Sequence, residues 1–381
     1  MARGSRRTYK PFPRHSGGAI TVKRFLLFLA AITFAAVLYL LVWPVTISPV
    51  AWTPQPAPPL SGPYEKNSKL ATVERLGIVP HAKGFAPEDV ALDAESRVYT
   101  GLDDGRIMRL EGADGHWVVF ADTHGRPLGM VFDASGNLIV ADAIKGLLSI
   151  ARDGSVTVLT TSADGVTFGC TNDLDIAADG TIYFTDASYK FPLTNYKADL
   201  MEHRGNGRFL AYDPKTKTTR TLAKDLVFAN GVAVSPDQSF ALVVETAKYR
   251  VHRVWLTGPQ AGQSDIFIDN LPGFPDGITS NGKGKFWLAL VTPRDATLDK
   301  LLPYPFLRKV VMRLPQFLQP APKRYSFVLG LDLKGQVTDN LQNGAPDCYA
   351  QIANAVQRDG SLYFGTIGEN TVGRFRLPTQ P

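Results

Sequence analysis

The sequence predicts an all-β protein, a six-bladed β-propeller preceded by a single N-terminal transmembrane helix. Two observations lead to this prediction: a pattern of paired strands recurs six times, and one long uncharged apolar stretch precedes it. The 381 residues include 34 glycines and 27 prolines, so turns are frequent. The apolar content of 44% and the charged content of 20% are those of an ordinary globular protein.

Each repeat contains a short polar motif, an apolar strand, a turn with glycine, asparagine or aspartate, and a second strand rich in aromatic or β-branched residues. The six repeats are residues 87–110, 126–150, 171–188, 230–256, 274–291 and 354–377. Units that recur at roughly 40–60 residues indicate a radial array. Six units of about four short strands each indicate a six-bladed β-propeller.

Two of these units carry insertions, one between residues 188 and 207 and the other at residues 292–323. The second insertion is apolar and basic, and no acidic residue follows Asp299 within it. Three interpretations stay open for it: a lid over the site, a surface that touches the membrane, or a helical excursion packed on the rim.

The apolar stretch at residues 25–43 is 19 residues long and uncharged. As a helix it measures about 28 Å, close to the hydrocarbon thickness of a bilayer. A cleaved signal peptide would have a shorter apolar core, about 7–15 residues, and a cleavage site of small residues. Here the stretch ends in Tyr39, Trp43 and Pro44, which is typical of a membrane interface. We therefore expect a retained signal anchor.

The predicted order is a basic cytoplasmic tail (1–24), the anchor (25–43), a Pro-rich linker (44–67) and the propeller (68–381). The tail holds seven basic residues and no acid, so the rest of the chain is near neutral although the net charge is +6. No basic patch therefore indicates a nucleic-acid partner. The positive-inside rule places the tail in the cytoplasm and the propeller in the periplasm or an organelle lumen. The linker is expected to be an extended, semi-rigid spacer.

The polar motif of each repeat precedes the strand that lines the channel of a propeller, so the motif points toward the axis. Oxygen-bearing side chains occupy this place in five repeats: Glu88-Asp89, Asn172-Asp173, Asn230, Asp276 and Asn354. Converging carboxylates repel one another, and calcium takes about six to eight oxygen ligands. We therefore predict a calcium ion that faces Glu88. The alternative is that Asn-Gly and Asp-Gly are ordinary turn residues.

The stretches PEDVALD, GRPLGMVFD, TNDLDIAADGTIYFTDAS, NGVAVSPDQSFALVVET and LPGFPDGI resemble the strictosidine synthase-like and adipocyte plasma membrane-associated protein-like propellers. That family is related to paraoxonases and gluconolactonases, and the resemblance covers about residues 70–377. It implies a calcium-dependent lactonase or arylesterase. The catalytic calcium of paraoxonases is held by residues that match Glu88, Asn172, Asn230 and Asp276. The resemblance also implies a deeper, structural calcium on residues that match Asp89, Asp173 and the main-chain carbonyl of Met130.

Three positions depart from the paraoxonase and strictosidine synthase patterns. Gly277 stands where paraoxonases have an asparagine ligand, and Leu128 stands where they have a histidine of the proposed base. His124, four residues earlier, is a weak substitute. Strictosidine synthases use a glutamate in the last blade for a Pictet–Spengler condensation, and residues 351–360 contain none. Alkaloid synthesis is therefore the least favoured function.

These patterns predict a calcium-dependent hydrolase of small esters or lactones, with Asp276 as the base or nucleophile. A non-enzymatic, membrane-tethered binding platform with a structural calcium is the alternative. The chain has no G-x-S-x-G elbow of a serine hydrolase. Cys170 and Cys348 can pair in an oxidising compartment or remain buried thiols, and their spacing does not decide between the two.

Overall fold

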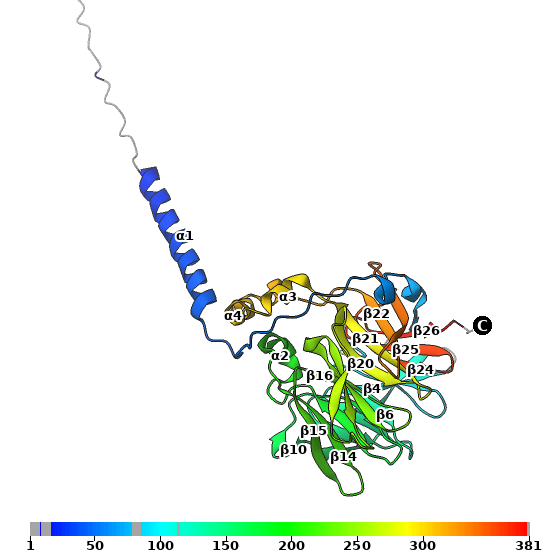
Figure 1. Cartoon of the computed structure of the whole chain (residues 1–381). Helices are drawn as coiled ribbons and strands as arrows, with labels where there is room; N and C mark the ends of the chain where they lie inside the picture. Colours follow the sequence, from blue (N-terminus) through cyan, green and yellow to red (C-terminus); the bar gives the residue numbers. More distant parts are fainter. Residues whose placement is uncertain (1–7, 9–16, 78–84, 113–114, 379–381) are drawn as a thin grey trace, which may run out of the picture. The chain divides into compact units, whose positions relative to one another are not determined.

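A computed structural model describes residues 8, 17–77, 85–112 and 115–378 (Figure 1). It divides into two compact units. The first combines Met1–Thr46 with Lys309–Gln319, and the second combines Ile47–Arg308 with Pro320–Pro381. Most of the predicted basic tail, 1–24, lies outside the described residues.

The first unit is built on helix α1 (Gly17–Val42). Its residues Val22–Val42 are long and apolar enough to cross a membrane, which confirms the predicted helix. The unit also contains the end of α4 (Pro305–Arg313) and the 3₁₀ turn η5 (Gln316–Leu318).

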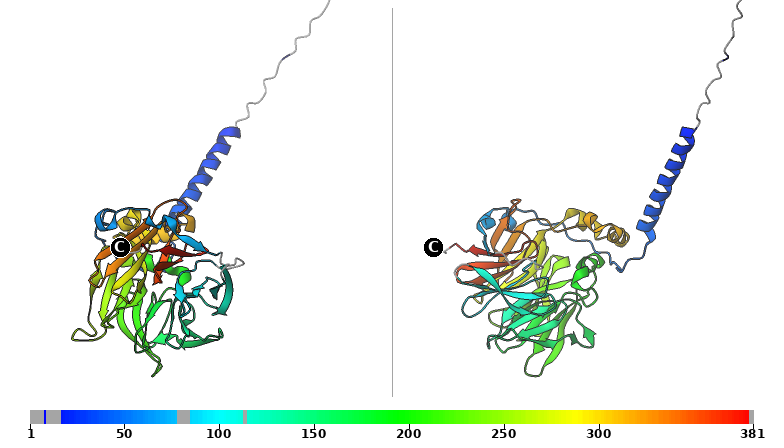
Figure 2. Two further views of the ribbon diagram at one scale, coloured as in Figure 1. Left: turned by 90° about the vertical axis from the view of Figure 1, so that its right-hand side faces the viewer. Right: turned by 180° about the vertical axis from the view of Figure 1, so that it is seen from behind.

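The second unit is a six-bladed β-propeller, as the repeats predict; in the described chain its blades are six antiparallel four-stranded sheets (Figures 1 and 2). The first three sheets comprise β2 (Val90–Leu92), β3 (Val98–Gly101), β4 (Arg106–Glu111) and β5 (His116–Asp122); β6 (Pro127–Phe132), β7 (Leu138–Asp142), β8 (Gly146–Ile150) and β9 (Val156–Thr160); and β12 (Thr171–Ile176), β13 (Ile182–Asp186), β14 (Gly207–Asp213) and β15 (Thr218–Leu226). The next two comprise β16 (Ala229–Val234), β17 (Phe240–Glu245), β18 (Arg250–Trp255) and β19 (Ser264–Ile268); and β20 (Gly273–Ser280), β21 (Lys285–Pro293), β22 (Ser326–Asp332) and β23 (Val337–Asn343).

The sixth blade joins the two ends of the propeller. Its strands β24 (Ile352–Arg358), β25 (Ser361–Thr366) and β26 (Val372–Arg376) are completed by β1 (Glu74–Leu76), which pairs with β26. The first strand of each blade contacts the first strand of the next, and β24 contacts β2, so the ring closes. The repeats alone did not indicate this outer strand, because its pairing joins residues about 300 positions apart.

Short elements complete the unit. They are a two-stranded hairpin, β10 (Ser162–Ala163) and β11 (Val166–Thr167), the helices α2 (Tyr196–Glu202) and α3 (Ala296–Leu301), and the 3₁₀ turns η1 (Gly62–Tyr64), η2 (Lys69–Thr72), η3 (Leu193–Asn195) and η4 (Thr246–Lys248).

The middle strands of the blades are buried on both faces, so their sequences are continuous apolar runs. Strands β7 and β17 are buried at every residue. The turns between strands are set by local polar contacts: Asp133 accepts the amides of Ser135 (2.9 Å) and Asn137 (2.8 Å). Gly136 in the same turn has φ +80°, a conformation that residues with a Cβ atom rarely adopt.

The Pro-rich segment differs from the free spacer expected over residues 44–67. From Ile47 onward it belongs to the propeller unit. The Ser48 amide donates to Glu202 (2.7 Å), and Trp52 stacks on the buried His203 with ring centroids 4.4 Å apart. The buried guanidinium of Arg308 donates to the Val50 carbonyl. Proline spacing alone cannot reveal such contacts, because their partners lie in the two insertions.

Candidate functional site

Five of the six polar motifs lie on an irregularity of an innermost strand, and the motif of the first blade directly precedes β2. The pairing register shifts in five of these strands, at Pro127–Met130, Thr171–Leu174, Ala229–Val232, Pro275–Ile278 and Ile352–Asn354. A β-bulge of this kind changes the direction of side chains that regular pairing would send to alternate faces. Each motif is therefore described by two consecutive residues, a first and a second position. Their first positions are Glu88, Leu128, Asn172, Asn230, Asp276 and Ala353, and their second positions are Asp89, Gly129, Asp173, Gly231, Gly277 and Asn354.

The second positions connect one blade to the next through hydrogen bonds. Asp89 accepts the Met130 amide of the following blade (2.8 Å), and Asp173 accepts the Val232 amide (2.9 Å). Both amides come directly after a second-position glycine. Asn354 of the last blade donates to Asp89 (2.5 Å), which joins the sixth blade to the first.

The glycines at second positions are needed because the next blade fills the space beside them. A Cβ atom at Gly129 would lie 2.4 Å from a carboxylate oxygen of Asp173. At Gly277 it would lie 2.6 Å from the Asn354 side chain. The departure of Gly277 from the asparagine of paraoxonases thus has a steric cause, since Asn354 occupies the place that a side chain would take.

The predicted deeper calcium involves residues that already have other partners. Besides the hydrogen bonds between blades, Asp89 accepts a hydrogen bond from the amide of its neighbour Val90 (2.7 Å). Asp173 accepts one from the amide of Leu174 (2.8 Å). Met130 contacts Asp89 through its amide, whereas the prediction uses its carbonyl. A second ion at Asp89, Asp173 and Met130 stays a prediction.

Four first positions hold polar side chains: the carboxylates Glu88 and Asp276 and the amides Asn172 and Asn230. Asn172, Asn230 and Asp276 are 4%, 5% and 7% exposed. Burial raises the pKa of Asp276 well above its ordinary value, and the charge of Glu88 raises it further, while a hydrogen bond with Asn230 lowers it. Glu88, Asn230 and Asp276 therefore lie together, and Asn172 has the equivalent place on β12.

A buried arginine that the sequence reasoning missed stands beside this group. Arg126 donates from one terminal nitrogen, Nη2, to Glu88 (3.0 Å) and to the Ala86 carbonyl (2.9 Å). Its other terminal nitrogen, Nη1, is buried and has no partner among the described residues. Burial raises the pKa of Glu88, and the charge of Arg126 opposes that rise. Only its place in GRPLGMVFD, directly before an inner strand, hinted at this role.

The first insertion packs over apolar residues next to the site. Tyr196 of α2 packs with a buried cluster that includes Leu128, Phe228 and Cys170. Burial raises the pKa of Tyr196, and the charges of Glu88 and Asp276 add to the rise, so the phenol lies near both carboxylates. Sequence reasoning located this insertion but did not single out Tyr196.

Two other sequence candidates lie outside this chemistry. The His124 side chain is 81% exposed and lies beside Asp122, so it does not contribute to the buried group. Cys170 and Cys348 are both buried free thiols, which answers the open question of their pairing. Burial raises the pKa of Cys170 well above its ordinary value, so its thiol stays protonated at neutral pH.

The first-position side chains suit a hard cation in their chemistry. Within the described ranges no three His, Cys, Asp or Glu residues form a ready metal cluster. The predicted ligand set contains only two acids, Glu88 and Asp276, and Glu88 pairs with Arg126 instead. Yet the donors are all oxygens, Glu88 is partly buried and the other three are buried, and the two carboxylates repel each other. Glu88, Asn172, Asn230 and Asp276 thus fit calcium, provided that Glu88 leaves Arg126.

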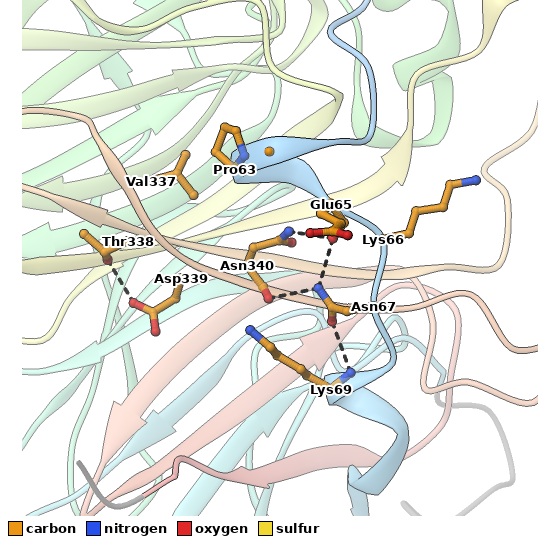
Figure 3. A pocket seen from close by; sticks show the side chains of 10 residues that line it. Pro63, Glu65, Lys66, Asn67, Lys69, Val337, Thr338, Asp339 and Asn340 are labelled. Atoms are coloured by element: carbon orange, nitrogen blue, oxygen red, sulfur yellow. Dashed lines mark hydrogen bonds between the residues drawn. The ribbon is translucent and has the colours of Figure 1, made fainter. Parts of the chain in front are cut away.

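A hollow of about 500 Å³ lies elsewhere on the propeller unit (Figure 3). It is lined by residues from 62–69 and 337–340, none of which belongs to the predicted calcium site. Asn67 donates to the Asn340 carbonyl at 3.1 Å there. This hollow therefore marks where the Pro-rich segment joins the fifth blade.

Comparison with known proteins agrees with this architecture. The family profile of strictosidine synthase matches residues 172–259, and that of the strictosidine synthase-like N-terminal region matches residues 62–110. The strictosidine synthase-like 7 protein of Arabidopsis thaliana is 41% identical over 305 residues, covering 77% of this chain and 80% of its own. The adipocyte plasma membrane-associated protein of Bos taurus is 32% identical over 385 residues, covering 94% and 92%.

Solved structures share the fold at low sequence identity. A gluconolactonase from Xanthomonas campestris superposes with a TM-score of 0.57 at 18% identity, covering 88% of this chain and 99% of its own. Regucalcin from Agrobacterium tumefaciens, a calcium-binding protein, gives 0.55 at 15% identity, covering 81% and 95%. At these identities the similarities show the fold alone. The curated relatives match most of their own length, and on that basis this chain belongs to the strictosidine synthase-like family.

Proposed function

We propose that this protein is a calcium-dependent hydrolase of esters or lactones. The observation that carries the proposal is the pair of the partly buried Glu88 and the buried Asp276, whose charges repel each other beside Asn230. The gluconolactonase and regucalcin, a calcium-binding protein, share the propeller fold, which supports lactone chemistry and calcium binding as possibilities for this fold without identifying a site here.

The residues around the pair have separable tasks. A bound calcium ion would polarise the substrate carbonyl and stabilise the negative charge that develops on its oxygen. Asp276 would accept a proton from the attacking water; burial raises the pKa of this carboxyl in the calcium-free protein, and a bound cation would keep it ionised and able to act as a base. Asn172 and Asn230 would hold the ion without adding charge. Leu128 and Phe228 belong to a buried apolar cluster against which Tyr196 packs, and this cluster excludes bulk water from the same region.

The substrate class that suits the side chains around this pair is a small, largely apolar ester or lactone. Leu128 and Phe228 offer no hydrogen bond from their side chains, whereas Tyr196 offers one phenol. The propeller is proposed to act in the periplasm or a lumen, tethered by α1, with the N-terminus in the cytoplasm. Membrane-associated relatives support the tether, and protease accessibility in sealed vesicles tests the side.

A binding platform with a purely structural calcium is the second candidate. The observation that favours it is burial, because Asn172, Asn230 and Asp276 are at most 7% exposed. A site so enclosed can tie blades together without admitting a substrate. The two candidates differ in whether a substrate reaches the ion.

Hydrolysis of phenyl acetate and a lactone panel separates the candidates. The full chain in detergent is assayed with calcium, after chelation and after calcium is restored, with thermal melting of each sample. A chain that starts at residue 60 is unsuitable, because it lacks the packed residues Ser48 and Trp52. Activity that disappears on chelation and returns with calcium supports the hydrolase. Melting that responds to calcium without any hydrolysis supports the platform.

A further inference from the structure

The end of the second insertion carries apolar side chains that the described chain leaves uncovered. Phe317 is 83% exposed and Leu318 is 57% exposed, and both lie on the 3₁₀ turn η5. Single exposed apolar residues are ordinary, but two large adjacent ones on a surface turn indicate a partner. The turn belongs to the same compact unit as α1, which is apolar enough to span a bilayer.

Arg313 fixes the position of this turn along α1. Its guanidinium donates to the Trp43 carbonyl at 2.6 Å and to the Leu40 carbonyl at 2.8 Å. Carbonyls at the end of a helix lack partners within the helix, and a cation is favoured there. Trp43 follows directly on the membrane-spanning segment, where aromatic side chains mark the interface. The exposed pair at 317 and 318 is therefore held near the depth at which α1 leaves the bilayer.

The charge of the segment agrees with this depth. Residues 309–319 contain Lys309 and Arg313 and no acidic residue. A segment with basic side chains and exposed large apolar side chains suits the boundary between headgroups and acyl chains. In open solvent the exposed apolar side chains would stay in contact with water, and a basic surface would repel the two cations.

We propose that residues 309–318 form a membrane-interface foot, with Phe317 and Leu318 inserted among the lipids around the end of α1. The occupant of this surface is the bilayer that α1 spans. The foot gives the anchor a second contact with lipid and restricts rotation of the end of α1 about its axis. A lid over the channel and a contact between two copies of the chain are the competing interpretations.

Depth-dependent fluorescence quenching tests the foot in the full chain. Phe317→Cys is labelled with a polarity-sensitive fluorophore and reconstituted into phosphatidylcholine vesicles, with or without a nitroxide-labelled phospholipid. The native thiols do not interfere, because Cys170 and Cys348 are buried. Lys283→Cys, on an exposed turn of the fifth blade, is the matched control. Leu318→Cys is a second position in case a label at 317 perturbs the turn.

The foot predicts a blue-shifted emission and loss of most fluorescence with the nitroxide lipid at 317 and 318, and neither change at 283. Arg313→Gln should weaken the quenching at 317, because the turn loses its attachment to α1. Labels at 317 and 318 that behave like the label at 283 would overturn the proposal. So would emission that responds to calcium or to protein concentration but not to the quencher, which would indicate the lid or the contact between copies.

Discussion

The first and second positions of the inner-strand motifs are sequence neighbours with opposite environments. Asp173 and Asp89 accept hydrogen bonds from main-chain amides of the next blade, so these hydrogen bonds join the blades although burial raises the pKa of both carboxyls. Asp276 and Glu88 have fewer such bonds and face each other across the same region. One residue step along the chain thus separates a carboxylate that joins blades from one that is available to a metal. Position within the motif, more than residue type, distinguishes the two.

The largest expected effect comes from removing the charge at a first position. Asp276→Asn keeps the size of the side chain but removes the base and weakens the metal site. Hydrolysis should fall by about 10²–10³-fold, a typical loss for a residue of this kind. The melting temperature without calcium should stay equal or rise, because a buried and repelled carboxylate has gone. Rates and melting curves of wild type and variant check this, and an active variant would contradict the proposed role.

The matched change at a second position should instead affect stability. In Asp173→Asn one of the two bonded amides, Leu174 or Val232, loses its acceptor, because an amide nitrogen cannot accept a hydrogen bond. We expect a loss of about 1–3 kcal/mol in the free energy of unfolding, with or without calcium. Urea titration measures this loss. Unchanged stability would mean that the ties between blades contribute little.

The pH dependence of stability gives a smaller effect, which compares Asp276→Asn with wild type. The pKa of Asp276 is raised in the folded protein, so the calcium-free fold holds a proton that the unfolded chain releases near pH 4. This contribution is fully present below about pH 4 and is lost as the pH rises through the folded pKa. The stability of Asp276→Asn relative to wild type should therefore increase with pH.

Measuring a difference between two chains removes an opposing contribution. Burial lowers the pKa of His203 to about 3, so the unfolded chain binds a proton there that the folded chain does not. His203 by itself therefore makes the fold more stable as the pH rises toward about 6.5. Both chains contain His203, and its effect cancels. Melting temperatures of the two proteins in chelator, taken across this range, are the measurement. A constant difference would show that Asp276 titrates normally.

The smallest expected effect concerns the arginine that competes for a first position. Arg126→Gln frees Glu88 from its ion pair and removes a positive charge near the ion. Calcium should bind about tenfold more tightly, which corresponds to roughly 1.4 kcal/mol. Calorimetric titration of both proteins measures this change. Weaker binding would indicate that Arg126 positions Glu88 for the metal.

Much of the fold could be predicted from the sequence because its signals are local. Alternating strands, turns such as Asp133 to Asn137, and the apolar residues 25–43 each identify an element within one short stretch. The closing strand could not be predicted in the same way, since Arg75 pairs with Gly373 across the whole propeller. The packing of Trp52 on His203 depends likewise on a distant insertion.

The candidate site was predictable only in part. The repeated motif identified Glu88, Asn172, Asn230 and Asp276, because the same strand position recurs in each blade. The motif could not show that Asp89 and Asp173 are occupied by amides, since this follows from the bulges. Nor could it show Asn354 beside Gly277 or Arg126 beside Glu88, which are contacts between different blades.

Calorimetric titration of calcium into the chelator-treated full chain, with Asp276→Asn and Asp173→Asn titrated in parallel, shows which of the two sets of positions holds the ion. We expect wild type to bind calcium, Asp276→Asn to bind it much more weakly, and folded Asp173→Asn to retain it. Calcium binding that survives Asp276→Asn and is lost in Asp173→Asn would place the ion on the second positions and contradict the division between the two sets. Absence of calcium binding to wild type would show that the proposed calcium site is wrong.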